Sequence, residues 1–211
     1  MALALGIDTA APVVGVALYG DEELLWSERV IRGADGVLGE VVARTIRDRH
    51  LDAIGVTVGP GAFTGIRVGV GLALGVAMAR AVPIVPCSSL FARAALVPGE
   101  PRVLAVLDAK RERVYAGAVR TDGAAPELLG DERDARLDDV LPSEPFVAVG
   151  EGALVFADAL LAAGARIALD PGASPALVVA RMALAPAAKR LGPEEVSIRY
   201  LRDPGITPNR S

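Results

Sequence analysis

One segment decides the fold of this 211-residue chain: Gly59-Pro60-Gly61-Ala62-Phe63-Thr64-Gly65-Ile66-Arg67. Before it, Ile54–Val58 is fully apolar, which is typical of a strand buried on both faces of a sheet. After it, apolar residues continue with helical spacing to about Arg80. Glycines at such a junction allow positive φ angles, Thr64 can cap the helix, and free amides at a helix N-terminus attract anions. The segment therefore predicts a strand-to-helix turn of an α/β protein, serving either structure alone or contact with a ligand or partner.

The helix that follows is apolar around its whole circumference. Counting by 3.6 residues places on one face Ile66, Gly69, Val70, Ala73, Leu74 and Ala77. The opposite face carries Val68, Gly71, Leu72, Gly75, Val76 and Ala79. A helix that is hydrophobic all round must be covered all round, and a chain this short has little material for two covering layers. We therefore predict that one face packs against another subunit; the alternative is burial within one domain.

The other apolar runs place this segment inside a larger unit. They predict strands at Leu3–Ile7, Val13–Tyr19, Leu24–Ile31 and Val82–Val85 and a helix at Leu38–Arg49. We assign residues 1–100 to an N-terminal α/β lobe that carries the partner-binding helix. Residues 101–211 form a C-terminal α/β lobe with an irregular tail. Its predicted elements are strands at Val103–Leu107, Val114–Val119 and Phe146–Val149 and helices at Ala153–Ala163 and from the Ser174 cap to about Leu191.

Composition excludes several classes of protein. The net charge is −4, and the basic residues are interspersed with acids, so tRNA or DNA binding by this chain alone is not expected. The longest apolar run, Val68 to Ala79, is shorter than the ~20 residues that a membrane span requires, and no signal peptide is evident. The single cysteine, Cys87, excludes an internal disulfide and fits a reducing compartment. With one histidine, His50, it cannot build the usual zinc site, so no metal is predicted.

Three acidic residues follow predicted strands, where active-site acids often lie. Asp8, Asp108 and Glu151 could each ligate Mg²⁺ or orient a phosphate, or could instead cap a turn. The sequence Gly-x-Ser-x-Gly is absent, and a Ser/His/Asp triad would have to recruit His50. No catalytic residue is therefore predicted.

Several motifs together resemble those of the bacterial TsaB (YeaZ) family. The specific match is the Gly-Pro-Gly segment at 59–67 leading into Val68-Gly-Val-Gly-Leu-Ala73, with Leu5-Gly-Ile-Asp-Thr9 opening the chain. Weaker matches follow in the same order at Ser88-Ser-Leu90, 107–115 and Tyr200-Leu-Arg202. The resemblance spans nearly the whole chain.

This resemblance implies a fold, a function and a set of partners. The fold is the two-lobed α/β architecture of actin, sugar kinases and the Hsp70 ATPase, which is related to ribonuclease H. The function is that of a non-catalytic scaffold that pairs with TsaD for threonylcarbamoyl transfer to the adenosine beside the tRNA anticodon. TsaE is a further partner, tRNA is reached only through the complex, and a homodimer forms when the protein is alone. This chain needs no cofactor by itself, ATP and metal belong to the partner subunits, and the location is cytoplasmic.

The resemblance also assigns residues. The partner interface comprises Gly59, Pro60, Gly61, Thr64, Arg67, Val68, Gly71, Leu72, Gly75 and Val76. The candidate nucleotide or phosphate contacts are Asp8, Thr9 and Asp108. The sequence departs from the family pattern at Gly33–Gly36, Ala62 and Ile198, and Thr9-Ala-Ala-Pro12 is not a phosphate turn of active kinases. The alternative function is an ATP-dependent small-molecule kinase of the same superfamily, in which Asp8 and Asp108 bind Mg²⁺ or act as base.

Overall fold

The first lobe is built on a five-stranded sheet. The computed structural model describes residues 2–20, 23–31, 37–168 and 174–202. Its first sheet has the order β3-β2-β1-β4-β5 and contains β1 (Leu3–Asp8), β2 (Val13–Gly20), β3 (Glu23–Ile31), β4 (Ala53–Thr57) and β5 (Ile84–Cys87). The first three strands are antiparallel, whereas β4 lies parallel to β1 and β5 parallel to β4. Two helices, α1 (Val37–Ile46) and α2 (Phe63–Arg80), make the crossovers.

The second lobe repeats this strand order. Its sheet has the order β11-β10-β6-β7-β8, with β9 also paired to β7. Again an antiparallel group precedes two parallel strands: β6 (Val103–Lys110), β7 (Arg113–Arg120), β8 (Glu127–Leu128), β9 (Arg133–Arg136), β10 (Val147–Val149) and β11 (Arg166–Ile167). The short helices of this half are η1 (Leu137–Asp139), α4 (Glu151–Val155) and α5 (Ala157–Ala162). No repeat is evident in the sequence, so the duplication is one of topology.

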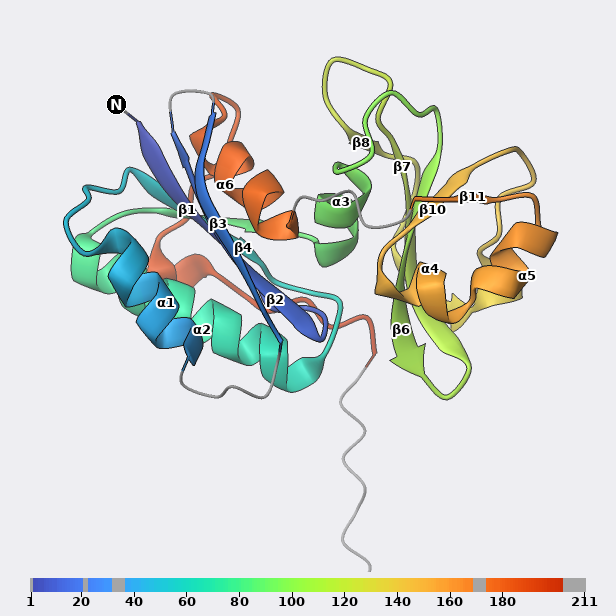
Figure 1. Ribbon diagram of the computed structural model, residues 1–211, viewed down its shortest axis with the longest axis horizontal. Coiled ribbons are helices and arrows are strands. Elements are labelled where there is room, and N and C mark those ends of the chain that lie inside the picture. The colour runs from blue at the N-terminus through green and yellow to red at the C-terminus, as the bar shows by residue number, and fades with distance from the viewer. Residues whose placement is uncertain (1, 21–22, 32–36, 169–173, 203–211) are drawn as a thin grey trace, which may run out of the picture.

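Each lobe contributes one helix to the other. Helix α3 (Ser89–Ala94) follows the last strand of the first sheet but packs against β6 and β7 of the second. Helix α6 (Pro175–Leu184) follows the second sheet but packs against β1, β2 and β4 of the first (Figure 1). The two-lobed actin-like fold is therefore confirmed. The division at residue 100 remains a prediction, and α6, which we placed in the C-terminal lobe, returns to the N-terminal sheet.

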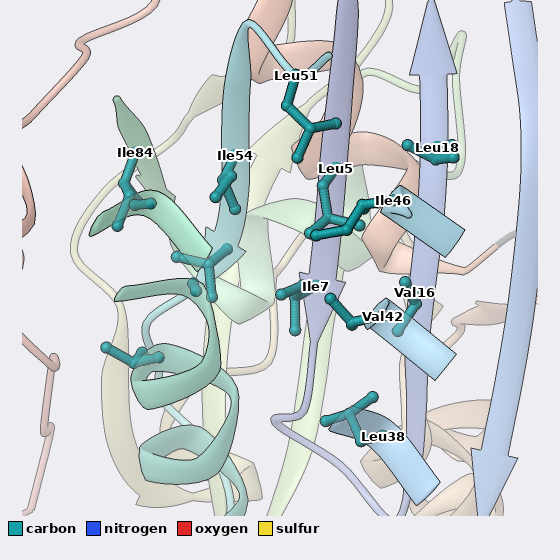
Figure 2. Close-up of a cluster of buried hydrophobic side chains, with 14 of the residues drawn as sticks. Leu5, Ile7, Val16, Leu18, Leu38, Val42, Ile46, Leu51, Ile54 and Ile84 are labelled. Carbon is teal, nitrogen blue, oxygen red and sulfur yellow. The ribbon is translucent and has the colours of Figure 1, made fainter. Parts of the chain in front are cut away.

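Large and small residues alternate along the central strands of the first sheet and decide what covers each face. The large side chains of β1 and β4 face α1 and α2, where Ile46 of α1 lies beside Leu5 and Val42 lies between Ile7 and Val16 (Figure 2). The opposite face carries small residues, and α6 lies directly on it. A Cβ on Gly6 would come within 1.9 Å of the Ala176 carbonyl oxygen. The glycines thus admit the backbone of α6 to the sheet.

The sequence predicted most elements but not all of their limits. Helix α6 ends at Leu184 rather than near Leu191, although Ser174 caps it as expected. The predicted helix at Ala153–Ala163 consists of α4 and α5, separated at Phe156. The strands β8, β9 and β11 and the six-residue helix α3 were not predicted, because each is too short to show a period.

Replacing Gly6 should test the contact between α6 and the sheet. We expect Gly6→Ala to lower the free energy of unfolding by about 3 kcal/mol, because the added methyl group meets backbone that cannot move independently. Urea denaturation measures this change. The control is Gly39→Ala in α1, where a Cβ meets nothing within 4 Å. That variant should gain about 0.5–1 kcal/mol from helix propensity, and an equal loss in both would contradict the packing argument.

Candidate partner-docking face and lobe junction

The Gly-Pro-Gly loop is held between two other backbone segments. A Cβ on Gly59 would lie 2.3 Å from the Arg199 carbonyl oxygen, and one on Gly61 would lie 2.5 Å from that of Ala10. Both glycines have positive φ angles, 116° and 155° respectively. The amide of Ala62 donates to the Ala10 carbonyl oxygen at 2.9 Å, so it is not free for an anion. These glycines therefore serve two close backbone contacts that larger residues would prevent.

The start of α2 corrects one prediction. We expected Thr64 to cap the helix, but Ala62 occupies the N-cap position and makes no side-chain capping bond. The helix begins at Phe63, two residues earlier than a cap at Thr64 would allow, because the Ala62 amide is bonded to Ala10 and the Ala62 carbonyl oxygen already accepts from the Ile66 amide. Thr64 lies in the first turn with its side chain exposed. The departure from the family pattern at Ala62 thus falls on the cap itself.

One side of α2 is sealed by the chain and the other is open. The sealed side contains Gly65, Ile66, Gly69, Val70, Ala73 and Ala77. We call the open side the α2 face and define it as Thr64, Val68, Gly71, Leu72, Gly75, Met78 and Ala79. Val68 is 53% exposed and Met78 is 73% exposed, while Leu72 is partly buried. A Cβ on Gly71 or Gly75 would meet nothing within 4 Å. The described part of the chain therefore leaves this apolar face uncovered.

The predicted interface residues divide according to their burial. Gly59 and Pro60 are buried and support the loop from within, whereas Gly61, Leu72 and Val76 are partly buried. The exposed members are Thr64, Arg67, Val68, Gly71 and Gly75. By length and composition alone α2 could cross a membrane, with 33% of its residues buried. Its sealed side packs on β4, however, and Gly69 lies directly against Thr9, so a protein surface fits the remaining side better than lipid does.

A short strap follows helix η2 (Pro193–Glu195), which comes after α6 in the chain, and this strap crosses between the lobes. We define the strap as residues 196–202. On the first lobe, the Arg199 amide donates to the Val58 carbonyl oxygen at 2.8 Å, and Ile198 packs against the core. On the second lobe, Arg202 forms a bidentate ion pair with Asp134. The departures at Gly33–Gly36 lie outside the described residues, but Ile198 is thus accommodated as a core contact.

Two carboxylates of the second lobe receive the strap. Glu132 has a fully buried side chain that accepts hydrogen bonds from Arg199 and from the hydroxyl of Ser88, the cap of α3. Burial raises the pKa of Glu132, although the Ser88 hydroxyl and the Arg199 charge oppose this. Asp134 also accepts from Arg113 at 2.7 Å. Burial raises the pKa of Asp134, but the hydrogen bonds from Arg202 and Arg113 outweigh it and lower that pKa below its usual value.

Tyr200 of the strap reaches the beginning of α2. Its ring centroid lies 5.5 Å from that of Phe63, and its hydroxyl accepts from Arg67 Nε at 3.1 Å. The Arg67 guanidinium lies 3.8 Å from the centroid of the Phe63 ring. Phe63 and Tyr200 are 41% and 39% exposed. The three side chains form a rim beside the α2 face, which we call the aromatic rim.

A buried arginine joins the two lobes. Arg93 of α3 is 2% exposed and donates to Asp8 Oδ2 at 3.1 Å and to both carboxylate oxygens of Glu151 at 2.8 and 3.0 Å. Its remaining nitrogen donates to the Ser89 carbonyl oxygen. Burial lowers the pKa of Arg93, but the charges of Asp8 and Glu151 outweigh it and raise that pKa above its ordinary value. Asp8 ends the central strand of the first sheet, so the pair fixes the lobes to each other.

The predicted nucleotide or phosphate contacts, Asp8, Thr9 and Asp108, each have a contact within the fold. Asp8 accepts from Arg93 and, at 2.7 Å, from Thr57, and Thr9 is buried against Gly69. The Asp108 carboxylate accepts from the amide and the side chain of Lys110, and it thereby caps the β6–β7 turn. The sequence interpretation missed Arg93, Glu132 and Asp134.

Cys87 and His50, the single cysteine and histidine, are the residues to examine for nucleophilic or metal-binding chemistry. Cys87 is buried, as predicted, and burial together with the charges of Glu132 and Asp8 raises the pKa of its thiol far above the ordinary value. The thiol is therefore protonated and a poor nucleophile. His50 is exposed. Among the described side chains no group of three or more His, Cys, Asp or Glu is arranged to hold a metal ion.

Removing the buried guanidinium should destabilise the junction. We expect Arg93→Met to lower the free energy of unfolding by about 3–5 kcal/mol, because Asp8 would then be a buried charge without its counterion. Guanidinium denaturation followed by circular dichroism measures this loss. Arg120→Met is the control, because Arg120 is 48% exposed and pairs with an exposed glutamate. The effect of Arg120→Met on the free energy of unfolding should stay within about 0.5 kcal/mol. Similar losses in both variants would disprove the role of Arg93 in joining the lobes.

The anchor at Asp134 should show a defined pH dependence. A carboxyl group with a lowered pKa stabilises the folded state above its unfolded pKa, here 3.8, and loses that contribution as pH falls through the folded value. The difference in unfolding free energy between the unaltered chain and Asp134→Asn should therefore be largest near neutral pH and disappear in acid. Urea titrations from pH 2.5 to 7 measure it. Glu144→Gln, which removes a 69% exposed partner of Arg102, should show no such trend.

Comparison with known proteins agrees with this geometry. The family described as "TsaD: tRNA N6-adenosine threonylcarbamoyltransferase" matches residues 31–163, which is more than half of the chain. The protein named "tRNA threonylcarbamoyladenosine biosynthesis protein TsaB" from Escherichia coli K12 is 32% identical over 127 residues, covering 56% of this chain and 55% of the relative. The Haemophilus influenzae protein of the same name is 32% identical over 124 residues, covering 54% and 52%. The chain thus spans about half the length of these curated relatives.

Solved structures extend the likeness to nearly the whole chain. A Pseudomonas aeruginosa protein described as similar to peptidase YeaZ superposes with a TM-score of 0.77 at 26% identity, covering 96% of this chain and all of the other. YeaZ from Pseudomonas aeruginosa gives a TM-score of 0.74 at 25% identity, covering 95% and 100%. The lobes, the Gly-Pro-Gly loop and these matches agree: the chain belongs to the TsaB (YeaZ) family.

Proposed function

We propose that this chain is a non-catalytic subunit in tRNA threonylcarbamoyladenosine biosynthesis and pairs with a TsaD-type protein through the α2 face. The uncovered face is the observation that carries the proposal. From Val68 to Ala79 the helix has no charged residue, and charge depletion is typical of the core of an interface. The two open glycines allow a partner helix to approach closely, since no side chain separates the backbones there.

The match to the TsaD family supports this choice of partner. A paralogous subunit of the same fold would carry its own helix after the corresponding strand, so two like helices could pack across a pseudo-twofold axis. The same geometry allows two copies of this chain to pair when no partner is present. We therefore propose the homodimer as the state of the isolated protein and the pair with TsaD as its working state.

The absence of a catalytic role is part of the proposal. Asp8 is engaged by Arg93 and Thr57, and the Cys87 thiol is protonated, so neither supports chemistry. We propose that ATP and metal bind in the partner subunits, that TsaE joins the assembly, and that tRNA is reached through the complex in the cytoplasm. The alternative of a small-molecule kinase has no support from Asp8 or Asp108, whose carboxylates are used within the fold.

A charge placed on the α2 face should prevent pairing. We expect Gly71→Arg to weaken binding to the TsaD-type subunit more than about 100-fold, because the interface would bury an unpaired charge. The free chain should keep its fold, since nothing surrounds a side chain at that position. Isothermal titration calorimetry measures the binding and circular dichroism the fold.

The same substitution at a second open glycine is the matched control. Gly39 lies on the exposed side of α1, and Gly39→Arg should bind the partner normally. Normal binding by Gly71→Arg would disprove the proposed role of the α2 face. Light scattering of both variants tests the homodimer in parallel, because only Gly71→Arg should become monomeric.

A further inference from the structure

We propose that the strap forms the rim of the docking surface and that Asp134, on the second lobe, is a positioning residue for it. This inference rests on the proposed function, because it concerns the same partner on the same helix. The strap is continuous with the α2 face through the aromatic rim. It adds a contact surface that the α2 face alone does not provide.

The rim has the chemistry of a binding anchor. Phe63 and Tyr200 keep about two-fifths of their surfaces exposed, at 41% and 39%. Arg67 lies over one ring and donates to the hydroxyl of the other, so the three side chains hold one another in a defined arrangement. Aromatic and arginine side chains fixed before binding lose little conformational entropy on association and are enriched among interface hot spots. A partner that covers the α2 face would meet this rim at the helix N-terminus.

The position of Tyr200 is determined from both sides. Toward the first lobe, the preceding residue Arg199 is bonded through its backbone to Val58 and lies against Gly59. Toward the second lobe, Arg202 is held by both oxygens of Asp134 and also donates to the Ala109 carbonyl oxygen. Asp134 is itself oriented by Arg113, through its carboxylate and its carbonyl oxygen. Tyr200 therefore lies between Arg199, whose side chain also pairs with Glu132 of the second lobe, and Arg202, which Asp134 holds.

This arrangement makes Asp134 act on the interface without lying in it. Its side chain is only 8% exposed and belongs to β9 of the second sheet, so a partner on α2 has no direct contact to gain from it. Loss of the ion pair would remove the carboxylate that holds Arg202 and so loosen Tyr200, which Phe63 and Arg67 would still contact. Partner affinity should then fall because the rim is less well ordered before binding.

A double-mutant cycle tests the inference. The full chain is titrated with the purified TsaD-type subunit in a calorimeter. We expect Tyr200→Ala to weaken binding about tenfold, as for a moderate hot spot, and Asp134→Asn to weaken it about three- to tenfold. The double variant should bind no worse than Tyr200→Ala alone, because both changes remove the same contact. Arg202→Lys keeps the charge pair and should lose less than Asp134→Asn does.

Two controls separate this inference from the proposed function. Glu144→Gln breaks an exposed ion pair elsewhere on the second lobe and should leave the affinity unchanged. Gly71→Arg should still weaken binding more than about 100-fold. If it does so while Tyr200→Ala and Asp134→Asn bind as the unaltered chain does, the strap has no role and the proposed function stands. If the unaltered chain does not bind the subunit, the proposed function and this inference are both wrong.

Amide hydrogen exchange of the free chain gives a readout that needs no partner. If Asp134 positions the strap, Asp134→Asn should accelerate exchange in residues 59–67 and 198–202 and leave β1 and β4 protected. A uniform increase over the whole chain would indicate general destabilisation and overturn the positioning role. Unchanged exchange at 59–67 would overturn it equally.

Discussion

The arrangement of the two lobes depends on one buried charge, the guanidinium of Arg93. A charge in this position is stable only with its counterions in place, because removing it from water is costly. Asp8 from the first sheet and Glu151 from the second lobe supply them, and the Ser89 carbonyl oxygen accepts a further bond. The three groups can satisfy one another only in a single relative position of the lobes. A hinge at this point would separate the charges, so the geometry favours a rigid arrangement of the two lobes.

That rigidity reaches the proposed docking surface through the turn after β1. Asp8 fixes the end of this strand, and Ala10, two residues later, receives the Ala62 amide at the start of α2. The strap adds a second connection from the other lobe, through Arg202 and Asp134. The residues of the α2 face all come from one helix, but the position of that helix depends on contacts with both lobes.

The sequence was sufficient for the longer elements and for the open side of α2, but not for the short elements or for the polar contacts between the lobes. Alternating apolar residues predicted the long strands, and the uncharged stretch from Val68 to Ala79 predicted a side of α2 that the described part of the chain does not cover. The pairs that organise the junction join residues far apart in the chain: Arg93 and Asp8 are separated by 85 positions, and Arg202 and Asp134 by 68. In a chain with 22 basic and 26 acidic residues, nothing local distinguishes these partners from solvated ones. Thr64 failed as a cap for a related reason, because a bond from a distant segment set where the helix starts.

The reciprocal placement of α3 and α6 has a consequence for biosynthesis. The last strand of the first sheet ends at Cys87, but the helix that covers its glycine-lined face begins only at Pro175. While the ribosome translates the intervening residues, the nascent first lobe presents bare strand backbone and small apolar residues on that side. Each lobe is complete only with a helix from the other side of the lobe boundary, and the first lobe receives its helix after the second sheet has been synthesised. During this interval we expect the nascent first lobe to depend on chaperones, because its α6-binding face is uncovered.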